Sequence, residues 1–289
     1  MKTPLSSFAL AVFVWLALAP GQLHAQASKI FVASFGNDAN DGSRGSTRRT
    51  FQAAHDAVAD NGQIVVLDTA GYGQLTITKS LAVTVPPGVN GFVTVSGNNP
   101  GVFIKSPSSG TLVSLRGLII EGGGGFAAGI VMNQGTLNLD DCIVRDFQDG
   151  VVIGANGQPG SVAILVARGV QVRNCGIGIR GFADSTGVGV ILTDCAVNNC
   201  SSYGVQGLAS DFPNTNLQMT LTRCALTANT TGIRSFGFFS TVYVDNCTLS
   251  NNATGLVTFS NGKIVTRGNN TFTNNYSGDG AFTGTLSAK

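Results

Sequence analysis

The sequence is poor in the residues that build helices. It contains one glutamate, Glu121, and few lysines, but 39 glycines and many Asn, Thr, Ser and Val residues. Glycine and β-branched residues disfavour helix interiors, whereas β-branched residues suit strands and Gly, Asn and Ser suit turns. Apolar residues make up 43% of the chain, which is enough for a hydrophobic core and argues against disorder. We therefore expect an all-β fold.

The chain also lacks an excess of either charge. Seventeen Lys and Arg residues stand against fifteen Asp and Glu residues, so the basic excess that usually marks a nucleic-acid binder is missing. No apolar run is longer than the one from Phe8 to Ala19, which is shorter than the ~20 residues that cross a bilayer as a helix. We expect no nucleic-acid partner and, after cleavage of the signal described next, no membrane insertion.

That first apolar run predicts export. Lys2 precedes it, and the small-residue triplet Ala25-Gln26-Ala27 follows it. This is the pattern of a signal peptide covering residues 1–27, with cleavage after Ala27. The mature chain is then expected to be secreted or periplasmic and to form one domain, since all-β architectures of this length are often undivided.

A short phrase recurs along the chain: apolar, any residue, apolar, two residues, Cys, any residue, apolar. Its Cys position, taken by Leu or Val in two coils, is filled by Leu118, Cys142, Val170, Cys195, Cys224 and Cys247. Consecutive members are 23 to 29 residues apart, a spacing typical of the coils of a solenoid. We predict a single-stranded right-handed parallel β-helix, or β-solenoid, in which this column points inward.

Two more columns follow the first. The one four residues later, or five in a single coil, contains Asp146, Asn174, Asn199, Asn229 and Asn251. Asn tolerates the left-handed conformation and bonds nearby backbone, so this column predicts a tight turn in every coil. The next column contains Gly150, Gly178, Gly204, Gly232 and Gly255. It predicts a second bend or a close approach between coils.

The recurring phrase also occurs in leucine-rich repeats, which return through a helix or a short 3₁₀ segment. The return segments here are stretches such as 255–262, Gly-Leu-Val-Thr-Phe-Ser-Asn-Gly. These residues make a poor helix and a reasonable strand and turn. The return segments therefore favour the β-helix over the leucine-rich repeat.

The exposed ends of such a stack need covers. From Thr50 to Asp60, Phe51, Ala54 and Val58 have helical spacing, which predicts an N-terminal capping helix. Residues 28–62 are thus assigned to an N-terminal strand and the capping helix, and residues 63–289 to the β-helix. The Gly-rich segment from Tyr276 to Lys289 is expected to fold over the last coil.

The six cysteines lie in the inward columns of this register, with Cys175 and Cys200 sharing a second one. Neighbours in a column have parallel Cβ directions about 4.8 Å apart, outside the ~3.5 to 4.5 Å of a disulfide. We therefore predict buried free thiols rather than the three disulfides that an exported chain would normally suggest.

The entry segment contains five short motifs: Phe31-Val32-x-x-x-Gly36-Asn37-Asp38, Thr50-Phe51-Gln52-x-Ala54, Gly62-x-Ile64, Gly71-Tyr72 and Ile77-Thr78-Lys79-Ser80. In these motifs the chain resembles the secreted right-handed parallel β-helix proteins of the pectate-lyase-like superfamily. The resemblance covers nearly all of the mature chain, and these motifs mark the start of the fold rather than an activity.

The superfamily includes polysaccharide lyases that pair bound calcium with an Arg or Lys base, and hydrolases that use several Asp residues with a His and an Arg-x-Lys. The chain has no Gly-His-Gly and no Arg-x-Lys, and Asp140-Asp141 lacks the preceding Gly of the hydrolases. Fold alone does not imply function. The first hypothesis is therefore a non-catalytic, glycan-associated or surface structural module without a cofactor, with polysaccharide as the possible partner.

The alternative is a lyase that acts on an acidic polysaccharide with an Arg base and calcium. Outward positions on the repeated strand supply its candidates: Arg145 and Arg173 as catalytic residues, and Glu121, Asp141 and Gln171 as substrate-binding residues. Arg suits the carboxylates of such a substrate. The other interpretation of this strip is a ladder of exposed ion pairs, each worth ~0 to 1 kcal/mol. The acidic residues nearby that could hold calcium are Asp141, Asp146 and Asp149.

Overall fold

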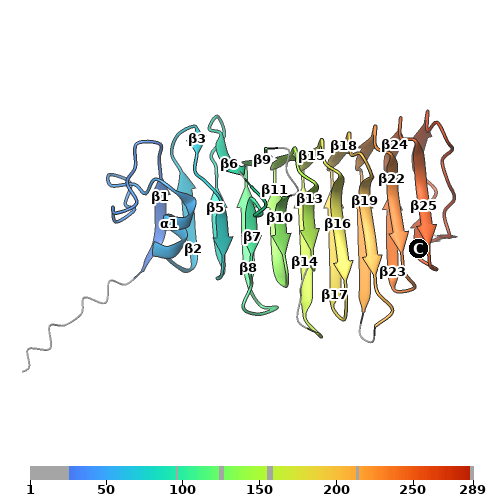
Figure 1. The fold of residues 1–289 in the computed structure, drawn as a ribbon, viewed down its shortest axis with the longest axis horizontal. Helices are drawn as coiled ribbons and strands as arrows, with labels where there is room; N and C mark the ends of the chain where they lie inside the picture. The colour runs from blue at the N-terminus through green and yellow to red at the C-terminus, as the bar shows by residue number, and fades with distance from the viewer. Residues whose placement is uncertain (1–25, 96, 124–126, 155–158, 213–214, 287–289) are drawn as a thin grey trace, which may run out of the picture.

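The computed structural model describes residues 26–95, 97–123, 127–154, 159–212 and 215–286. In this part of the chain, successive coils stack side by side (Figure 1), and the coils in the middle of the stack each contribute one strand to each of three sheets. All strand pairs are parallel, as in β11 with β14 and β14 with β17. The predicted all-β parallel β-helix is confirmed.

The first sheet has eleven strands among the described residues. They are β1 (Ala27–Val32), β2 (Val58–Val66), β5 (Leu81–Thr84), β8 (Leu112–Arg116), β11 (Gly135–Asp140), β14 (Val162–Arg168), β17 (Gly187–Thr193), β20 (Asn216–Thr222), β23 (Ser240–Asp245), β26 (Lys263–Thr266) and β28 (Gly284–Thr285). Their side chains alternate between the core and the outside, as the two-residue period of a strand requires.

The second sheet, which follows the first within each coil, has nine strands in the same residues. They are β3 (Ala70–Gly71), β6 (Gly91–Val95), β9 (Leu118–Gly122), β12 (Ile143–Arg145), β15 (Gln171–Arg173), β18 (Ala196–Asn198), β21 (Ala225–Thr227), β24 (Thr248–Ser250) and β27 (Thr271–Thr273). In each coil, the strand of this sheet contains or follows the recurring Cys position. These strands are therefore the ones that the repeat phrase predicted.

The third sheet closes each coil and has eight described strands. They are β4 (Leu75–Ile77), β7 (Val102–Ile104), β10 (Ala128–Met132), β13 (Asp149–Ile153), β16 (Ile177–Ala183), β19 (Tyr203–Ala209), β22 (Thr231–Phe236) and β25 (Thr254–Phe259). It contains the return segments, including the stretch after Gly255. These segments are strands, which excludes the helical return of a leucine-rich repeat.

The predicted inward column forms part of a continuous core. Leu118, Cys142, Val170, Cys195, Cys224 and Cys247 are all buried, at most 3% exposed. All six cysteines of the chain are buried and carry free thiols. Burial raises the pKa of the Cys142 thiol to about 12, so it remains protonated and behaves as a small apolar side chain.

The turn column adopts the left-handed conformation, with one correction. Asp146, Asn174, Asn199 and Asn251 have φ between 54° and 66°. In the coil where we expected Asn229 to take this position, Ala228 does so with φ 56°. Asn229 instead points inward and is 3% exposed, because its amide joins a buried ladder with Asn252 and Asn275.

The glycine column marks a close approach, which was one of its two predicted roles. A Cβ on Gly150 would lie 2.5 Å from the carbonyl oxygen of Gly178, and one on Gly178 would lie 2.5 Å from that of Gly204. Neither glycine has a positive φ. Glycine is required here because the backbone of the next coil occupies the space of a side chain.

The N-terminal helix is present but shorter than predicted. It is α1 (Phe51–Ala57), with Thr50 as its N-cap, and it lies at the N-terminal end of the stack (Figure 1). The sequence pattern extended it to Asp60, but Val58 has an extended backbone with ψ 144° and begins β2. Pairing of β2 with β1 and β5 satisfies this backbone better than another helical turn would.

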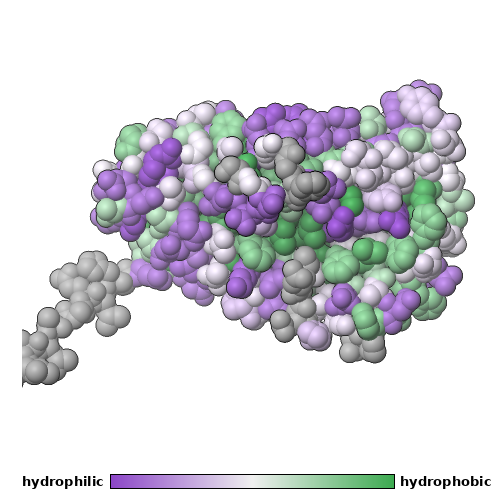
Figure 2. All heavy atoms as spheres, in the orientation of Figure 1, coloured by the Kyte–Doolittle hydropathy of each residue, from purple (hydrophilic) through white to green (hydrophobic). Residues whose placement is uncertain are grey.

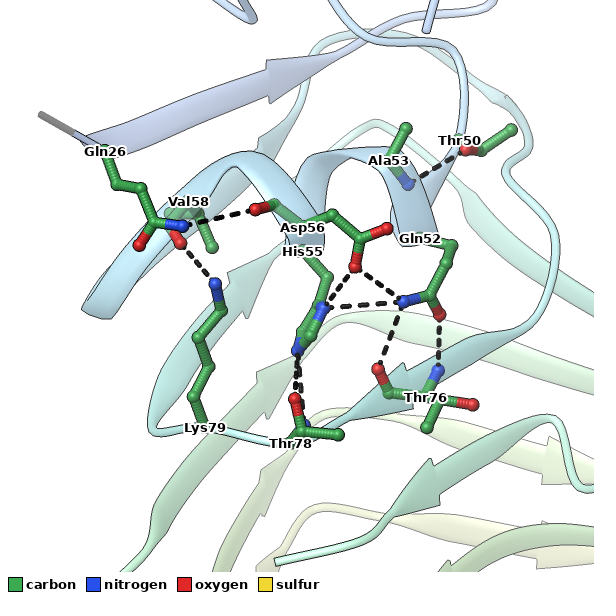
Figure 3. Close-up of polar contacts among 10 residues, drawn as sticks. All are labelled: Gln26, Thr50, Gln52, Ala53, His55, Asp56, Val58, Thr76, Thr78 and Lys79. Atoms are coloured by element: carbon green, nitrogen blue, oxygen red, sulfur yellow. Dashed lines mark hydrogen bonds and ion pairs between the residues drawn. The ribbon is translucent and has the colours of Figure 1, made fainter. Parts of the chain in front are cut away.

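Polar contacts attach α1 to the first coil (Figure 3). The Gln52 side chain accepts the N–H of Thr76 at 2.8 Å, and Nε2 of the buried His55 accepts the N–H of Thr78 at 3.2 Å. Lys79 Nζ donates to the carbonyl of Val58. His55 therefore has a packing role in the cap.

The C-terminal segment covers the last coil, as expected. Phe282 packs on Phe272, with ring centres 5.7 Å apart, and both contact the core. Strand β28 then pairs with β26. Residues 1–25 of the predicted signal peptide lie outside the described residues. Among the residues that are described, no helix has the length and apolar character needed to cross a membrane.

Candidate functional site on the outer face of the third sheet

The predicted strip on the second sheet is a set of neighbours in register. Arg145 pairs with Glu121 on one side and with Arg173 on the other, while Gln171 lies beside Ile143. Arg145 Nη2 lies 2.8 Å from Glu121 Oε2, and its Nε lies 3.8 Å from Asp146 Oδ2. Glu121 and Arg145 are thus brought together as an ion pair whose side chains are each about one third exposed.

The three aspartates considered for calcium have different partners. Asp141 lies 3.7 Å from Arg116, Asp149 lies 3.0 Å from Arg180, and Asp146 accepts a hydrogen bond from Asn174. Among the described residues, no group of three or more His, Cys, Asp or Glu side chains could hold a metal ion. The structure therefore does not gather these carboxylates into one site.

A groove of about 700 Å³ follows the turns between the second and third sheets. It is lined mainly by the turn column and the residues after it, from Asp146 to Tyr276. Asn174 donates to Asp146, and Asn199 donates to Asn174 at 2.7 Å. These amides bond to one another along the stack, so they are less available to a ligand.

A different set of polar residues lies on the outer face of the third sheet. Arg180, Gln206 and Arg234 are in register on β16, β19 and β22, and we call them the arginine–glutamine ladder. The residues before them, Ile179, Val205 and Ile233, are almost completely buried in the core. Because side chains alternate along a strand, the ladder points outward.

The ladder contains polar atoms that lack partners within the described residues. Gln206 is only 3% exposed, yet its Oε1 accepts no hydrogen bond. The Nε atoms of Arg180 and Arg234 donate none. A buried polar group without a partner costs about 1 to 3 kcal/mol, so such groups are rare and call for a specific explanation. Three in adjacent coils point to a site that binds a polar ligand.

Asp149 lies at one end of the ladder. Its Oδ1 is 3.0 Å from Arg180 Nη2, and its side chain is 18% exposed. Desolvation raises the pKa of this carboxyl above its ordinary value, and the charge of Arg180 opposes that shift. Asp149 therefore neutralises one of the two arginines whenever it is ionised.

Aromatic rings surround the other end. The guanidinium carbon of Arg234 lies 4.8 Å from the ring centre of Tyr203, 5.2 Å from that of Phe236 and 5.4 Å from that of Phe259. Cation–π attraction holds the guanidinium over these rings. In Figure 2 hydrophobic and hydrophilic side chains adjoin on the C-terminal half of the face shown. The Arg234 end of the ladder thus combines positive charge with aromatic surface.

Sequence reasoning missed the ladder although a signal exists. Gly178, Gly204 and Gly232 of the glycine column are each followed two residues later by a ladder member. The three ladder members therefore share one offset from the glycine column, and comparing that offset across the coils would have found Arg180, Gln206 and Arg234 as one row.

These features define a parallel β-helix with an outward cationic and aromatic face. Comparison with known structures finds the same fold in polysaccharide-acting enzymes. A pectate lyase, Pel9A, is 15% identical with a TM-score of 0.64, covering 90% of this chain and 78% of the other. A rhamnogalacturonan lyase is 12% identical with a TM-score of 0.58, covering 82% and 72%. An alginate lyase from Paenibacillus sp. str. FPU-7 is 10% identical with a TM-score of 0.52, covering 79% and 96%.

At such identities the likeness concerns the fold. It confirms the structural resemblance to the pectate-lyase-like proteins. No protein-family model and no curated protein sequence matches the chain.

Proposed function

We propose that the protein is an exported glycan-binding module that holds an acidic polysaccharide on the outer face of its third sheet. The observation that carries the proposal is the buried Gln206 Oε1 without a partner, flanked in register by Arg180 and Arg234. Guanidinium groups bind carboxylates through paired, charge-assisted hydrogen bonds. Few polar groups among aromatic side chains are typical of a ligand site.

The geometry favours a polymer over a small anion. Neighbouring strands lie ~4.8 Å apart, so Arg180 and Arg234, two coils apart, are separated by roughly 10 Å along the stack. One small anion cannot contact both, whereas a saccharide chain lying along the β-helix axis can. The polysaccharide-acting enzymes of similar fold also support this class of ligand.

The function that we propose first is binding of the polysaccharide without turnover, which requires no cofactor. Asp149 is the carboxylate that pairs with a ladder arginine, at 3.0 Å from Arg180. A polysaccharide lyase working through Arg145 or Arg173, with calcium near Asp141, Asp146 or Asp149, is the alternative. It predicts calcium-dependent formation of unsaturated products, whose ultraviolet absorbance would disappear in Arg173→Ala.

Removal of the ladder charges is the direct test of binding. Arg234→Ala and Arg180→Ala should each weaken binding to polygalacturonate or alginate by roughly tenfold or more, because a hydrogen bond to a charged group contributes about 1.5 to 3 kcal/mol. Calorimetry or affinity electrophoresis at constant salt measures this.

Arg168→Ala is the matched control. Arg168 ends β14 of the first sheet, and its side chain is 69% exposed, so the change removes the same charge away from the ladder. Equal losses in all three variants would indicate nonspecific attraction. A loss confined to Arg145→Ala and Arg173→Ala would move the site to the second sheet.

Protonation of Asp149 should strengthen binding. The pKa of this carboxyl is raised, so as pH falls through it, Asp149 loses its charge and Arg180 becomes free for the ligand. Since the folded-state pKa exceeds the unfolded value, protonation also stabilises the fold relative to the unfolded chain. A sulfated polysaccharide keeps its own charge over this range and is the appropriate probe.

Asp149→Asn should bind this probe more tightly at neutral pH and lose most of the pH dependence. Asp184→Asn is a control, since Asp184 follows β16 and bonds to Ser210. If Asp149→Asn retained the pH profile of the unaltered protein, another group would be responsible.

A further inference from the structure

A hollow next to the ladder has walls of a different chemistry. It measures about 520 Å³ and lies at the turns between the third and first sheets; we call it the aromatic hollow. Its lining residues are Phe238, Thr258, Phe259, Ser260, Asn261, Gly262, Lys263 and Thr283. Phe238 is 55% exposed and Phe259 is 52% exposed. Exposed rings gathered at one place indicate an interaction surface.

The backbone around the aromatic hollow is tightly defined. Both Gly237 and Gly262 donate hydrogen bonds to the carbonyl of Phe259, at 3.2 and 2.9 Å. A Cβ on Gly262 would lie 2.5 Å from the carbonyl oxygen of Ser235, so the turn packs directly on the coil before it. The ring of Phe238 is supported by Phe239, with ring centres 5.2 Å apart. The two exposed rings are therefore held by the fold.

The other lining groups suit sugar hydroxyls rather than charged substituents. Thr258, Ser260, Asn261 and Thr283 offer hydroxyl and amide groups, and Lys263 Nζ lies 5.7 Å from the ring centre of Phe238. The lining residues include no carboxylate. Lys263 is the single cation, and it is engaged with an aromatic ring.

The aromatic hollow and the ladder form a continuous surface. Phe259 lines the hollow and also lies under the guanidinium of Arg234. Phe236 and Phe259 are paired in register on β22 and β25. A chain that places a carboxylate at Arg234 therefore extends directly over the two exposed rings.

We propose that the aromatic hollow binds an uncharged pyranose unit through its apolar ring face, and that the natural ligand is a heteropolysaccharide in which acidic units are joined to neutral ones. This inference rests on the proposed function. The rings pack against the C–H face of the sugar, and the hydroxyl and amide groups contact its edge. The ladder binds the neighbouring acidic unit, so a polymer made only of uronates leaves the hollow without its preferred unit.

The test compares Phe238→Ala with the unaltered full-length protein on two soluble polymers. One is polygalacturonate, which contains only acidic units, and the other is hyaluronate, in which uronates alternate with uncharged amino sugars. Phe238 has no contact with Arg234 among the cation–π pairs, so its removal leaves the ladder intact. Loss of one aromatic contact should weaken hyaluronate binding roughly threefold to tenfold, with little change for polygalacturonate.

Phe212→Ala is the control, because Phe212 is 56% exposed but does not line the aromatic hollow. If Phe238→Ala left the affinity for hyaluronate unchanged while Arg234→Ala still weakened binding of both polymers, the proposed role of the aromatic hollow would be wrong. The proposed function at the ladder would not be contradicted by that result. If Arg234→Ala changed neither affinity, the proposed function itself would fail. A uniform loss for both polymers in Phe238→Ala would also overturn the selectivity for a neutral unit.

Discussion

Gly178→Ala is expected to destabilise the middle of the β-helix strongly. The new Cβ would lie 2.5 Å from the carbonyl oxygen of Gly204 and 2.4 Å from Cγ1 of Val197. Neither atom can move freely, because one belongs to the backbone of the next coil and the other to the core. Overpacking costs about 1 to 3 kcal/mol where side chains can adjust, so we expect a loss of about 3 kcal/mol or more in the free energy of unfolding.

Gly189→Ala is the matched control for denaturant unfolding. Gly189 lies in β17, has no positive φ, and a Cβ there would meet only Ile164, at 3.8 Å. Alanine should be tolerated or slightly stabilising, since it reduces the entropy of the unfolded chain. If both variants were as stable as the parent, the coils could not be stacked as closely as the structure has them.

Asn252→Ala is the second substitution with a large expected effect. Asn252 is fully buried, and its Oδ1 accepts the N–H of Asn229 at 2.9 Å while its Nδ2 donates to the carbonyl of Leu226 at 3.0 Å. Its Nδ2 also bonds to Asn275. Alanine leaves a buried donor and a buried acceptor without partners, each costing about 1 to 3 kcal/mol. The free energy of unfolding should fall by about 2 to 6 kcal/mol.

The preceding residue gives a control for this change. Asn251 is exposed and has φ 57°, a conformation that glycine adopts freely. Asn251→Gly should therefore change the free energy of unfolding by less than about 1 kcal/mol. Hydrogen exchange adds a local readout: the Asn229 amide should exchange faster in Asn252→Ala and remain protected in Asn251→Gly. Equal protection in both variants would contradict the buried ladder.

The fold and the proposed site make different demands on the chain. Stacking requires glycine and buried asparagine at fixed levels of the coil, on the inside. The ladder and the aromatic hollow lie at outward positions, where stacking accepts almost any side chain. The proposed binding rests on residues at these positions: two arginines, a buried glutamine and exposed phenylalanines.

The sequence by itself determined the architecture. One coil cannot bury its apolar side, so residues such as Cys195 and Cys224 must recur at coil spacing and point inward, and this period is visible without coordinates. The glycine column was equally readable, because a close approach demands the absence of a side chain in coil after coil. The presence of a helix near Phe51 followed from the helical spacing of Phe51, Ala54 and Val58, whereas its N-cap at Thr50 is known from the structure.

Other features were decided only by the tertiary structure. The end of α1 depends on the pairing of Val58 with Ala27 of β1. The inward turn of Asn229 depends on its partner Asn252 in the next coil. The charged strip around Arg145 was prominent in the sequence because it adjoins the Cys phrase, and only the structure shows that Arg145 forms an ion pair with Glu121 there. Gln206 and Arg234 have polar atoms without partners because of the side chains that neighbouring coils place beside them. The loops between strands vary in length, so the sequence alone does not give the register that decides these neighbours.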